Sequence, residues 1–201
     1  MGIEAMSPAS GRMIGDNDKV VNIIETVTGG LLTTESDHTA NHRGYGYKTH
    51  LSITNLAAGQ SLSWCWTGPH TLFAHLKNFS LMALGSSCKL ELLTGADVTV
   101  NTGTAVSLIN TNHNSDRTAQ STLKAAPTYS GGTMWDQVMA LVDSTNQVVG
   151  ISSFQASPYE ELITKDGDTN YIFKVTNIGS DLLQSAWIKI FFYEEPIGII
   201  E

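Results

Sequence analysis

Two of the six histidines in this chain share a spacing that metal sites use. His38 and His42 stand four positions apart, which would place both imidazoles on one face of a helix. The surrounding segment, residues 37–44, lacks the apolar stripe that a helix needs in order to pack. We therefore expect a solvated loop here and predict no metal site.

The acidic residues and serines do not form a catalytic pattern. Glu35, Asp37 and His38 are neighbours, but no serine stands in a Gly-x-Ser-x-Gly sequence, which would present it as a nucleophile. Adjacent residues in a strand point to opposite faces, so neither Glu160-Glu161 nor Glu194-Glu195 makes a glycosidase dyad by itself. We expect Glu160 and Glu194 at strand ends near solvent, and we predict no catalytic residue and no cofactor.

Aromatic residues alternate with small or polar ones in two places. Tyr45 and Tyr47, and likewise Trp64 and Trp66, stand two positions apart and so lie on one face of a strand. In a sandwich such pairs belong to the core more often than to the surface, and core packing is our prediction. The alternative is an exposed platform on which sugar rings stack, as in a receptor- or glycan-binding module.

The cysteines and a run of asparagines have structural interpretations. Cys65 and Cys88 form no Cys-x-x-Cys motif, and we expect free thiols packed in the core, with a single bridge as the alternative. Asn110, Asn112 and Asn114 carry amides that bond irregular backbone or a partner. Composition does not separate a rigid loop from a contact surface.

The composition favours contacts with other proteins. Charged residues are 15% of the chain, compared with roughly 25% in typical domains, and small hydroxyl and amide side chains cost less to bury than lysine or glutamate. The net charge of −8 and the lack of a lysine or arginine cluster disfavour nucleic acid. No run approaches about 18 apolar residues and no signal peptide is recognisable, so we predict no membrane partner and synthesis in the cytoplasm.

Short β-rich runs separated by Gly, Ser and Asn indicate an all-β protein. Asp166-Gly167 predicts a hairpin between Glu161–Lys165 and Asn170–Val175, and Met134–Asp143 fits a short helix or an edge strand. The predicted strands are Val20–Val27, Tyr45–Ile53, Leu62–Trp66, Thr71–Leu76, Asn78–Leu84, Lys89–Leu93, Asp97–Val100, Ala105–Ile109, Thr118–Ala126, Gln147–Phe154 and Leu182–Glu194. Pro127–Gly132 is predicted as a loop.

We predict an antiparallel, jelly-roll-like β-sandwich with an extended N-terminal arm. The arm covers residues 1–19, the single sandwich domain residues 20–195, and a C-terminal tail residues 196–201. The arm's Met6, Met13 and Ile14 and the tail's Ile197 and Ile199 are apolar, and we expect them to be buried by a partner.

Three stretches carry a resemblance to a known group of proteins. They are Leu108 to Ser115 with its repeated asparagines, Glu161-Leu162-Ile163 followed by Asn170 to Asn177, and the ending Phe192-Tyr193-Glu194-Glu195. In these the chain, from about Val20 to Glu195, resembles virion proteins of tailed bacteriophages, particularly head decoration or cement proteins.

The resemblance implies a non-enzymatic homotrimer on the capsid exterior that joins neighbouring copies of the major capsid protein. Three contacts per trimer would convert weak single contacts into strong attachment. Asn110, Asn112 and Asn114 would then be contact residues, together with the apolar residues of the arm and tail. The alternative is a receptor- or glycan-binding module of a phage head or tail fibre.

Overall fold

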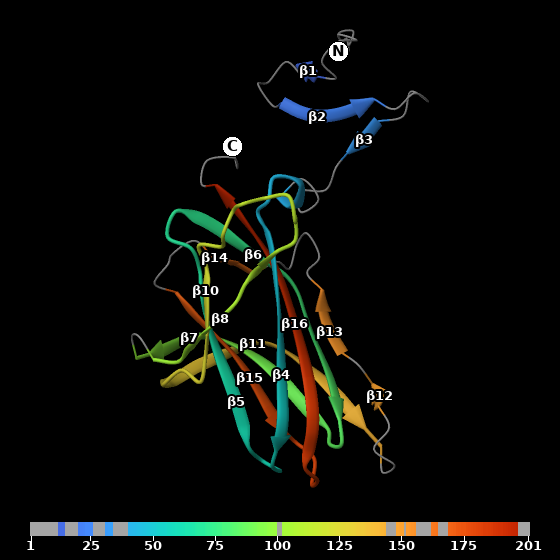
Figure 1. The fold of residues 1–201 in the computed structure, drawn as a ribbon, viewed down its shortest axis with the longest axis vertical. Coiled ribbons are helices and arrows are strands. Elements are labelled where there is room, and N and C mark those ends of the chain that lie inside the picture. Colours follow the sequence, from blue (N-terminus) through green and yellow to red (C-terminus); the bar gives the residue numbers. More distant parts are fainter. Residues whose placement is uncertain are drawn as a thin grey trace.

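The chain forms two large antiparallel β-sheets packed face to face, and a third, small sheet (Figure 1). The computed structural model describes residues 12–14, 20–25, 31–33, 40–99, 102–143, 148–150, 152–155, 162–164 and 169–196. The small sheet has the order β1-β2-β3, with β1 Arg12–Ile14, β2 Val20–Glu25 and β3 Leu31–Thr33. The predicted strand at Val20 is therefore present, paired with strands on either side of it.

The first large sheet has seven strands in the order β12-β11-β7-β15-β5-β10-β8. Their bounds are β5 Ser61–Thr67, β7 Cys88–Val98, β8 Thr104–Val106, β10 Thr122–Ala125, β11 Tyr129–Val142, β12 Val148–Gly150 and β15 Asn170–Asn177. Every pairing in this sheet is antiparallel.

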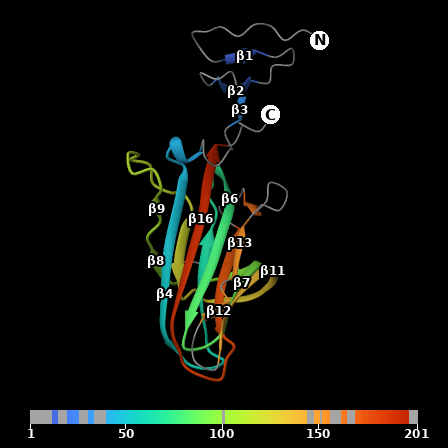
Figure 2. The same ribbon diagram turned by 90° about the vertical axis from the view of Figure 1, so that its right-hand side faces the viewer.

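The second large sheet has the order β13-β6-β16-β4-β9, and β14 also pairs with β6. The bounds are β4 Gly46–Leu56, β6 Leu72–Leu84, β9 Ile109–Asn110, β13 Ser152–Gln155, β14 Leu162–Thr164 and β16 Leu183–Pro196. Figure 2 shows β4, β16 and β6 side by side along one face of the molecule. The predicted all-β sandwich is confirmed, whereas the jelly-roll connectivity and the arm stay predictions.

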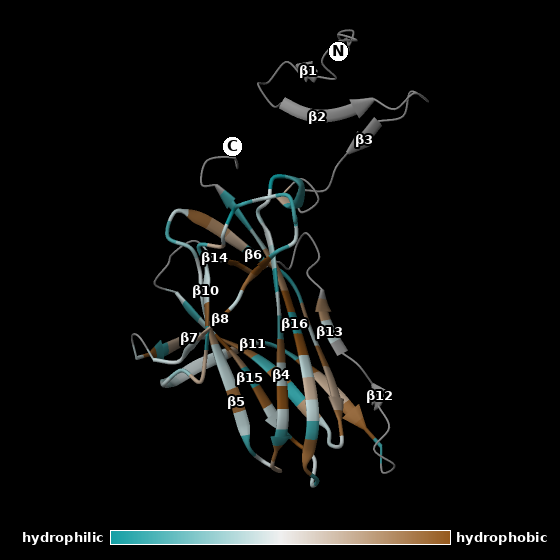
Figure 3. Cartoon of the chain, in the orientation of Figure 1, coloured by the Kyte–Doolittle hydropathy of each residue, from teal (hydrophilic) through white to brown (hydrophobic). Residues whose placement is uncertain are grey.

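The core lies between the two sheets and follows from alternation along the strands. In β16, Ile188, Ile190 and Phe192 point inward and are at most 2% exposed. Phe192 meets Trp66 of the other sheet with 5.3 Å between ring centroids. Figure 3 shows the resulting alternation of apolar and polar residues along β4 and β16. Burying each large side chain of this kind stabilises the fold by about 1.5–3 kcal/mol.

The predicted hairpin at Asp166-Gly167 is wrong. β14, which precedes this dipeptide, pairs with β6, whereas β15, which follows it, pairs with β5 and β7. The two strands therefore lie in different sheets, and the dipeptide itself lies outside the described residues. A local turn signal predicts a hairpin only when long-range packing does not place the flanking strands elsewhere.

Several predicted strand boundaries also change. Leu72–Leu84 is a single strand where two were predicted, and so is Cys88–Val98. The Met134–Asp143 segment is an edge-type strand, part of β11, up to Val142, and not a helix. The predicted loop Pro127–Gly132 contains Gly131 and Gly132 with φ of 66° and 100°, yet β11 begins at Tyr129 because β7 pairs with it from that residue.

Asn177 joins the two large sheets at one end of the sandwich. It is fully buried at the end of β15. Its Nδ2 donates to the carbonyl oxygens of Leu56, at 2.9 Å, and Asp181, at 2.8 Å. Its Oδ1 accepts from the Ser86 hydroxyl at 2.8 Å and the Gly179 amide at 3.1 Å. The side chain therefore satisfies backbone groups at the end of β4 and in the β15–β16 connection, and the Ser86 hydroxyl in the β6–β7 connection.

We expect Asn177→Ala to lower the free energy of unfolding by about 2–4 kcal/mol, because several buried polar groups lose their partner together. Urea unfolding at neutral pH measures this change. Asn114→Ala, at an exposed position, is the matched control and should stay within about 0.5 kcal/mol of wild type. Equal effects of the two substitutions would contradict this role for Asn177.

Candidate functional site

The best-defined polar site lies at Glu194, close to the end of β16. The prediction that this residue lies near solvent is wrong. Glu194 is 0% exposed. One carboxylate oxygen, Oε1, accepts from the Ser121 amide at 2.7 Å, and Oε2 accepts from the Gln120 amide at 3.0 Å. Its own amide donates to the Tyr45 carbonyl at 2.9 Å. Glu160, the other predicted end-of-strand residue, lies outside the described residues.

Glu194 lies in a buried region that includes the aromatic residue Tyr47. Tyr47 is 1% exposed, and burial, reinforced by the negative charge of Glu194, raises its pKa to about 12. Arg117 acts in the opposite direction on this pKa, and its guanidinium lies 4.3 Å from the centre of the Tyr45 ring. Within the described part of the chain, the buried Trp66 Nε1 and Ser121 Oγ atoms have no hydrogen-bond partner.

The arrangement around Glu194 is better suited to holding backbone than to proton transfer. Both carboxylate oxygens receive main-chain amides from the segment that leads into β10. Because β16 belongs to one large sheet and β10 to the other, Glu194 ties the sheets together at the end opposite Asn177. A carboxylate that accepts two amide hydrogen bonds in a buried place acts as a structural cap.

The asparagine segment forms a hydrogen-bonded loop beside this end. Asn110 Nδ2 donates to the carbonyl oxygens of Gly44, at 2.8 Å, and Arg117, at 3.0 Å. Asn112 Nδ2 donates to the His42 carbonyl at 2.9 Å. The backbone N–H of Asn114 donates to Asn112 Oδ1 at 3.0 Å. Asn110 and Asn112 therefore rigidify the loop, and the predicted binding of a partner by all three stays a prediction.

Of the other predicted site residues, some lie outside the described residues and others are confirmed as core. Met6, Ile197 and Ile199 lie outside the described residues, and so do the side chains of Met13 and Ile14, whose backbone belongs to β1. Trp64 and Trp66 are 6% and 1% exposed, which confirms them as core and leaves no sugar platform there. Cys65 and Cys88 are buried free thiols, as predicted, and burial raises the pKa of Cys88 to about 12.

The histidines do not gather into a metal site in the described ranges. His42, His50, His70 and His113 are exposed, and His38 lies outside those ranges. His75 is buried, stacks on Tyr193 at 4.4 Å between centroids, and places Nε2 3.3 Å from a carboxylate oxygen of Glu195. No group of three or more His, Cys, Asp or Glu side chains there could hold a metal ion.

Residues of β11 form an exposed apolar strip that the sequence analysis did not single out. Met134, Met139 and Leu141 are 51%, 42% and 45% exposed, and we call these three the β11 strip. They pair with β7 and β12, and a register shift between Met134 and Asp136 marks a bulge at Trp135. The signal in the sequence was weak, because Met134–Asp143 also fitted a helix.

The fold places this chain in the class of all-β sandwich proteins. No protein-family model matches the chain, and the search of curated proteins found no match. In the portion of the chain that the structure describes, no helix is long and apolar enough to cross a membrane.

We expect Glu194→Gln to destabilise the sandwich by about 1–3 kcal/mol, because the new amide group would face a main-chain N–H and leave that donor unsatisfied. Urea unfolding measures the effect. Glu195→Gln, which makes the same charge change one residue later at a partly exposed position, should cost less. A larger loss for Glu195→Gln would contradict the cap.

Stability should also fall at alkaline pH because the pKa of Tyr47 is raised above its ordinary value of 10.0. The neutral phenol is favoured in the folded state, so its contribution is complete below pH 10 and is lost as pH rises toward 12. Tyr47→Phe has no phenol to ionise, so it lacks this part of the alkaline loss of stability. The dependence of the free energy of unfolding on pH between 8 and 11 should be flatter for Tyr47→Phe than for wild type, and equal slopes would contradict the raised pKa of Tyr47.

Proposed function

We propose that the chain is a non-enzymatic structural protein of a virion, a decoration protein that stabilises contacts between major capsid subunits. It is made in the host cytoplasm, joins the capsid exterior and works as a homotrimer. The resemblance of the Leu108–Ser115 segment and of the last strands to phage decoration proteins supports the virion assignment. The β11 strip supports the assembly.

The observation that carries the proposal is the half-open edge of β11. From Tyr129 to Ala140 this strand pairs with β7 on one side, and β12 pairs only with Leu141 and Val142. Among the described residues, no strand pairs with most of β11 on its other side, so this part is an edge strand, with Phe154 of β13 packed on Trp135. Such an edge is a place where another chain adds a strand.

The side chains of the strip match such a contact. Met139 pairs with Lys89, and Gln137 pairs with Glu91, so apolar and polar groups alternate across the outer face. The 2.7 Å ion pair between Lys89 and Glu91 neutralises the charges closest to Met139. Covering a half-exposed Met or Leu side chain contributes about 1 kcal/mol, so the strip alone supports a modest contact.

We assign the strip to the contact between copies of this chain. An open strand with three large apolar side chains promotes irregular association, and a closed ring of identical contacts would cover it. The bulge at Trp135 twists the edge and limits regular pairing to the residues after it. A trimer then brings three capsid-binding surfaces together, so that each attachment needs only a modest affinity.

The test uses two matched double variants. Met139→Lys with Leu141→Lys charges the strip, and Met82→Lys with Leu84→Lys makes the same change at similarly exposed residues of the other sheet. Analytical ultracentrifugation should give wild type and the second variant three times the chain mass of 21.7 kDa, and the first variant a single chain mass.

Two results would remove the proposal. Wild-type protein that stays monomeric at every concentration and does not bind capsids would exclude the decoration role. A trimer that survives in the Met139→Lys, Leu141→Lys variant would show that the strip is not the contact. Circular dichroism of all variants checks that the β-sandwich is intact.

A further inference from the structure

The outer face of the six-stranded sheet carries a second exposed cluster, on the opposite side of the sandwich from the β11 strip. Strand register defines its rows. Trp187 stands between Met82 of β6 and Ser52 of β4, and Lys189 stands between Ser80 and His50 in the next row. Trp187 is 47% exposed and Met82 42%.

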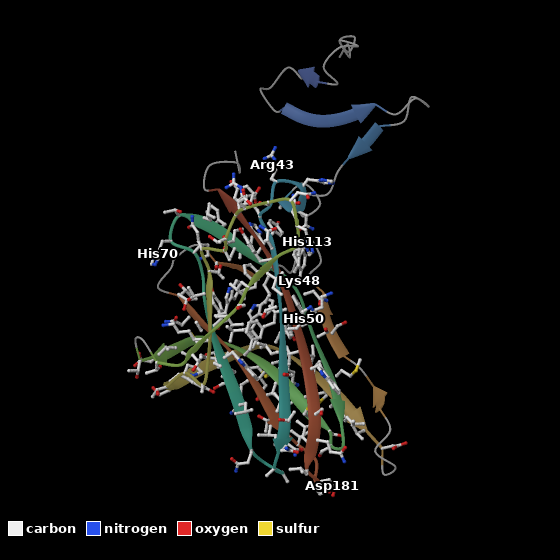
Figure 4. All side chains as sticks on the ribbon, viewed as in Figure 1. Arg43, Lys48, His50, His70, His113 and Asp181 are labelled. Carbon is white, nitrogen blue, oxygen red and sulfur yellow. The ribbon has the colours of Figure 1, made fainter. Side chains whose placement is uncertain are left out.

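A hollow of about 200 Å³ opens between these two rows. The side chains at its border are His50, Ser80, Met82, Trp187 and Lys189. Figure 4 shows His50 on β4 directly beside Lys48, in the middle of the molecule. One aromatic ring, one thioether and three polar groups thus surround the hollow, a combination that can contact both the apolar and the polar groups of a small ligand.

The polar groups of the hollow are available to a ligand. In the described structure, the Ser80 hydroxyl, the His50 imidazole and the Lys189 ammonium make no hydrogen bond or ion pair with another side chain. They come from three adjacent strands and face the same space. A ligand with hydroxyl and carboxylate oxygens would satisfy all three without displacing a protein contact.

The charge of this face differs from that of the whole protein. The chain has a net charge of −8, yet β4, β6 and β16 contain no Asp or Glu before Glu194. The same strands carry Lys48, Lys77 and Lys189. An anionic ligand is therefore attracted to this face although the protein as a whole repels it.

We propose that this hollow binds an acidic sugar residue, such as a uronic acid unit of a surface polysaccharide. The indole of Trp187 stacks on the apolar face of the pyranose ring. Lys189 and His50 bind the carboxylate, and the Ser80 hydroxyl bonds a ring hydroxyl. This inference does not depend on the decoration role, and it places sugar binding at the exposed Trp187 of β16 and not at the buried Trp64 and Trp66 of the other sheet.

An acidic peptide is the competing occupant, and the observations favour the sugar. The hollow is about 200 Å³, and the side chains of Leu51, Leu81 and Ile188, which border it, are buried in the core. It therefore offers no deep pocket for an apolar anchor side chain. A protein contact of ordinary strength requires such an anchor at its centre.

Isothermal titration with sodium glucuronate, and with glucose as the neutral probe, tests the proposal in the intact protein. We expect glucuronate to bind at least roughly tenfold more tightly than glucose, and added salt to weaken only glucuronate. An immobilised acidic polysaccharide, compared with a neutral one, shows whether the polymer rather than the free sugar is the ligand.

Three variants assign the site. Trp187→Ala should abolish binding of both sugars, and Lys189→Gln should remove the preference for glucuronate over glucose. Trp135→Ala, which alters a 37% exposed tryptophan on β11, is the matched control and should bind as wild type does. Absence of binding to both glucuronate and the acidic polysaccharide, or binding that survives in Trp187→Ala, overturns the proposal. So does a loss of self-association in Trp187→Ala, because it would make this face a contact between protein chains.

Discussion

The register of β16 is the constraint on which both the core and the surfaces of this protein depend. This strand runs between β4 and β6 and pairs with both over most of its length. Its inward residues fill the core and its outward residues, Trp187 and Lys189, face solvent. A slip by one residue would exchange the two sets, burying an ammonium group and exposing Ile188 and Ile190. The apolar pattern thus specifies one register strongly.

Two buried polar side chains reinforce that register at opposite ends of the sandwich. Asn177 contacts the carbonyl of Asp181 just before β16 begins, and Glu194 accepts two amides close to where the strand ends. Both lie where strands of different sheets meet. A shifted strand would leave these groups buried without hydrogen bonds, which costs more than the bonds themselves contribute. Their effect is therefore to exclude alternative registers as much as to stabilise the native one.

The sequence predicts correctly those features that alternation within a strand determines. Its predictions fail where contacts with distant segments determine the structure. Alternation located the strands around Tyr47 and Trp64 and assigned Trp64 and Trp66 to the core correctly. The turn signal at Asp166-Gly167 is local. The hairpin prediction failed because β14, before it, pairs with β6 in the six-stranded sheet, whereas β15, after it, belongs to the seven-stranded sheet. Glu194 was predicted near solvent because it is charged and close to a strand end. Its burial depends on amides more than seventy residues away in the chain.

The two candidate surfaces, likewise, could be predicted only in part from the sequence. Trp187 lies in the predicted strand Leu182–Glu194, but its proposed role depends on His50 and Ser80, which only sheet pairing brings near it. The β11 strip likewise depends on pairing with β7 and β12, which leaves Met134, Met139 and Leu141 exposed. Because the two surfaces belong to different sheets, the proposed association through β11 would leave the Trp187 hollow open to solvent. The proposed assembly through one sheet and the proposed ligand binding through the other would therefore not compete.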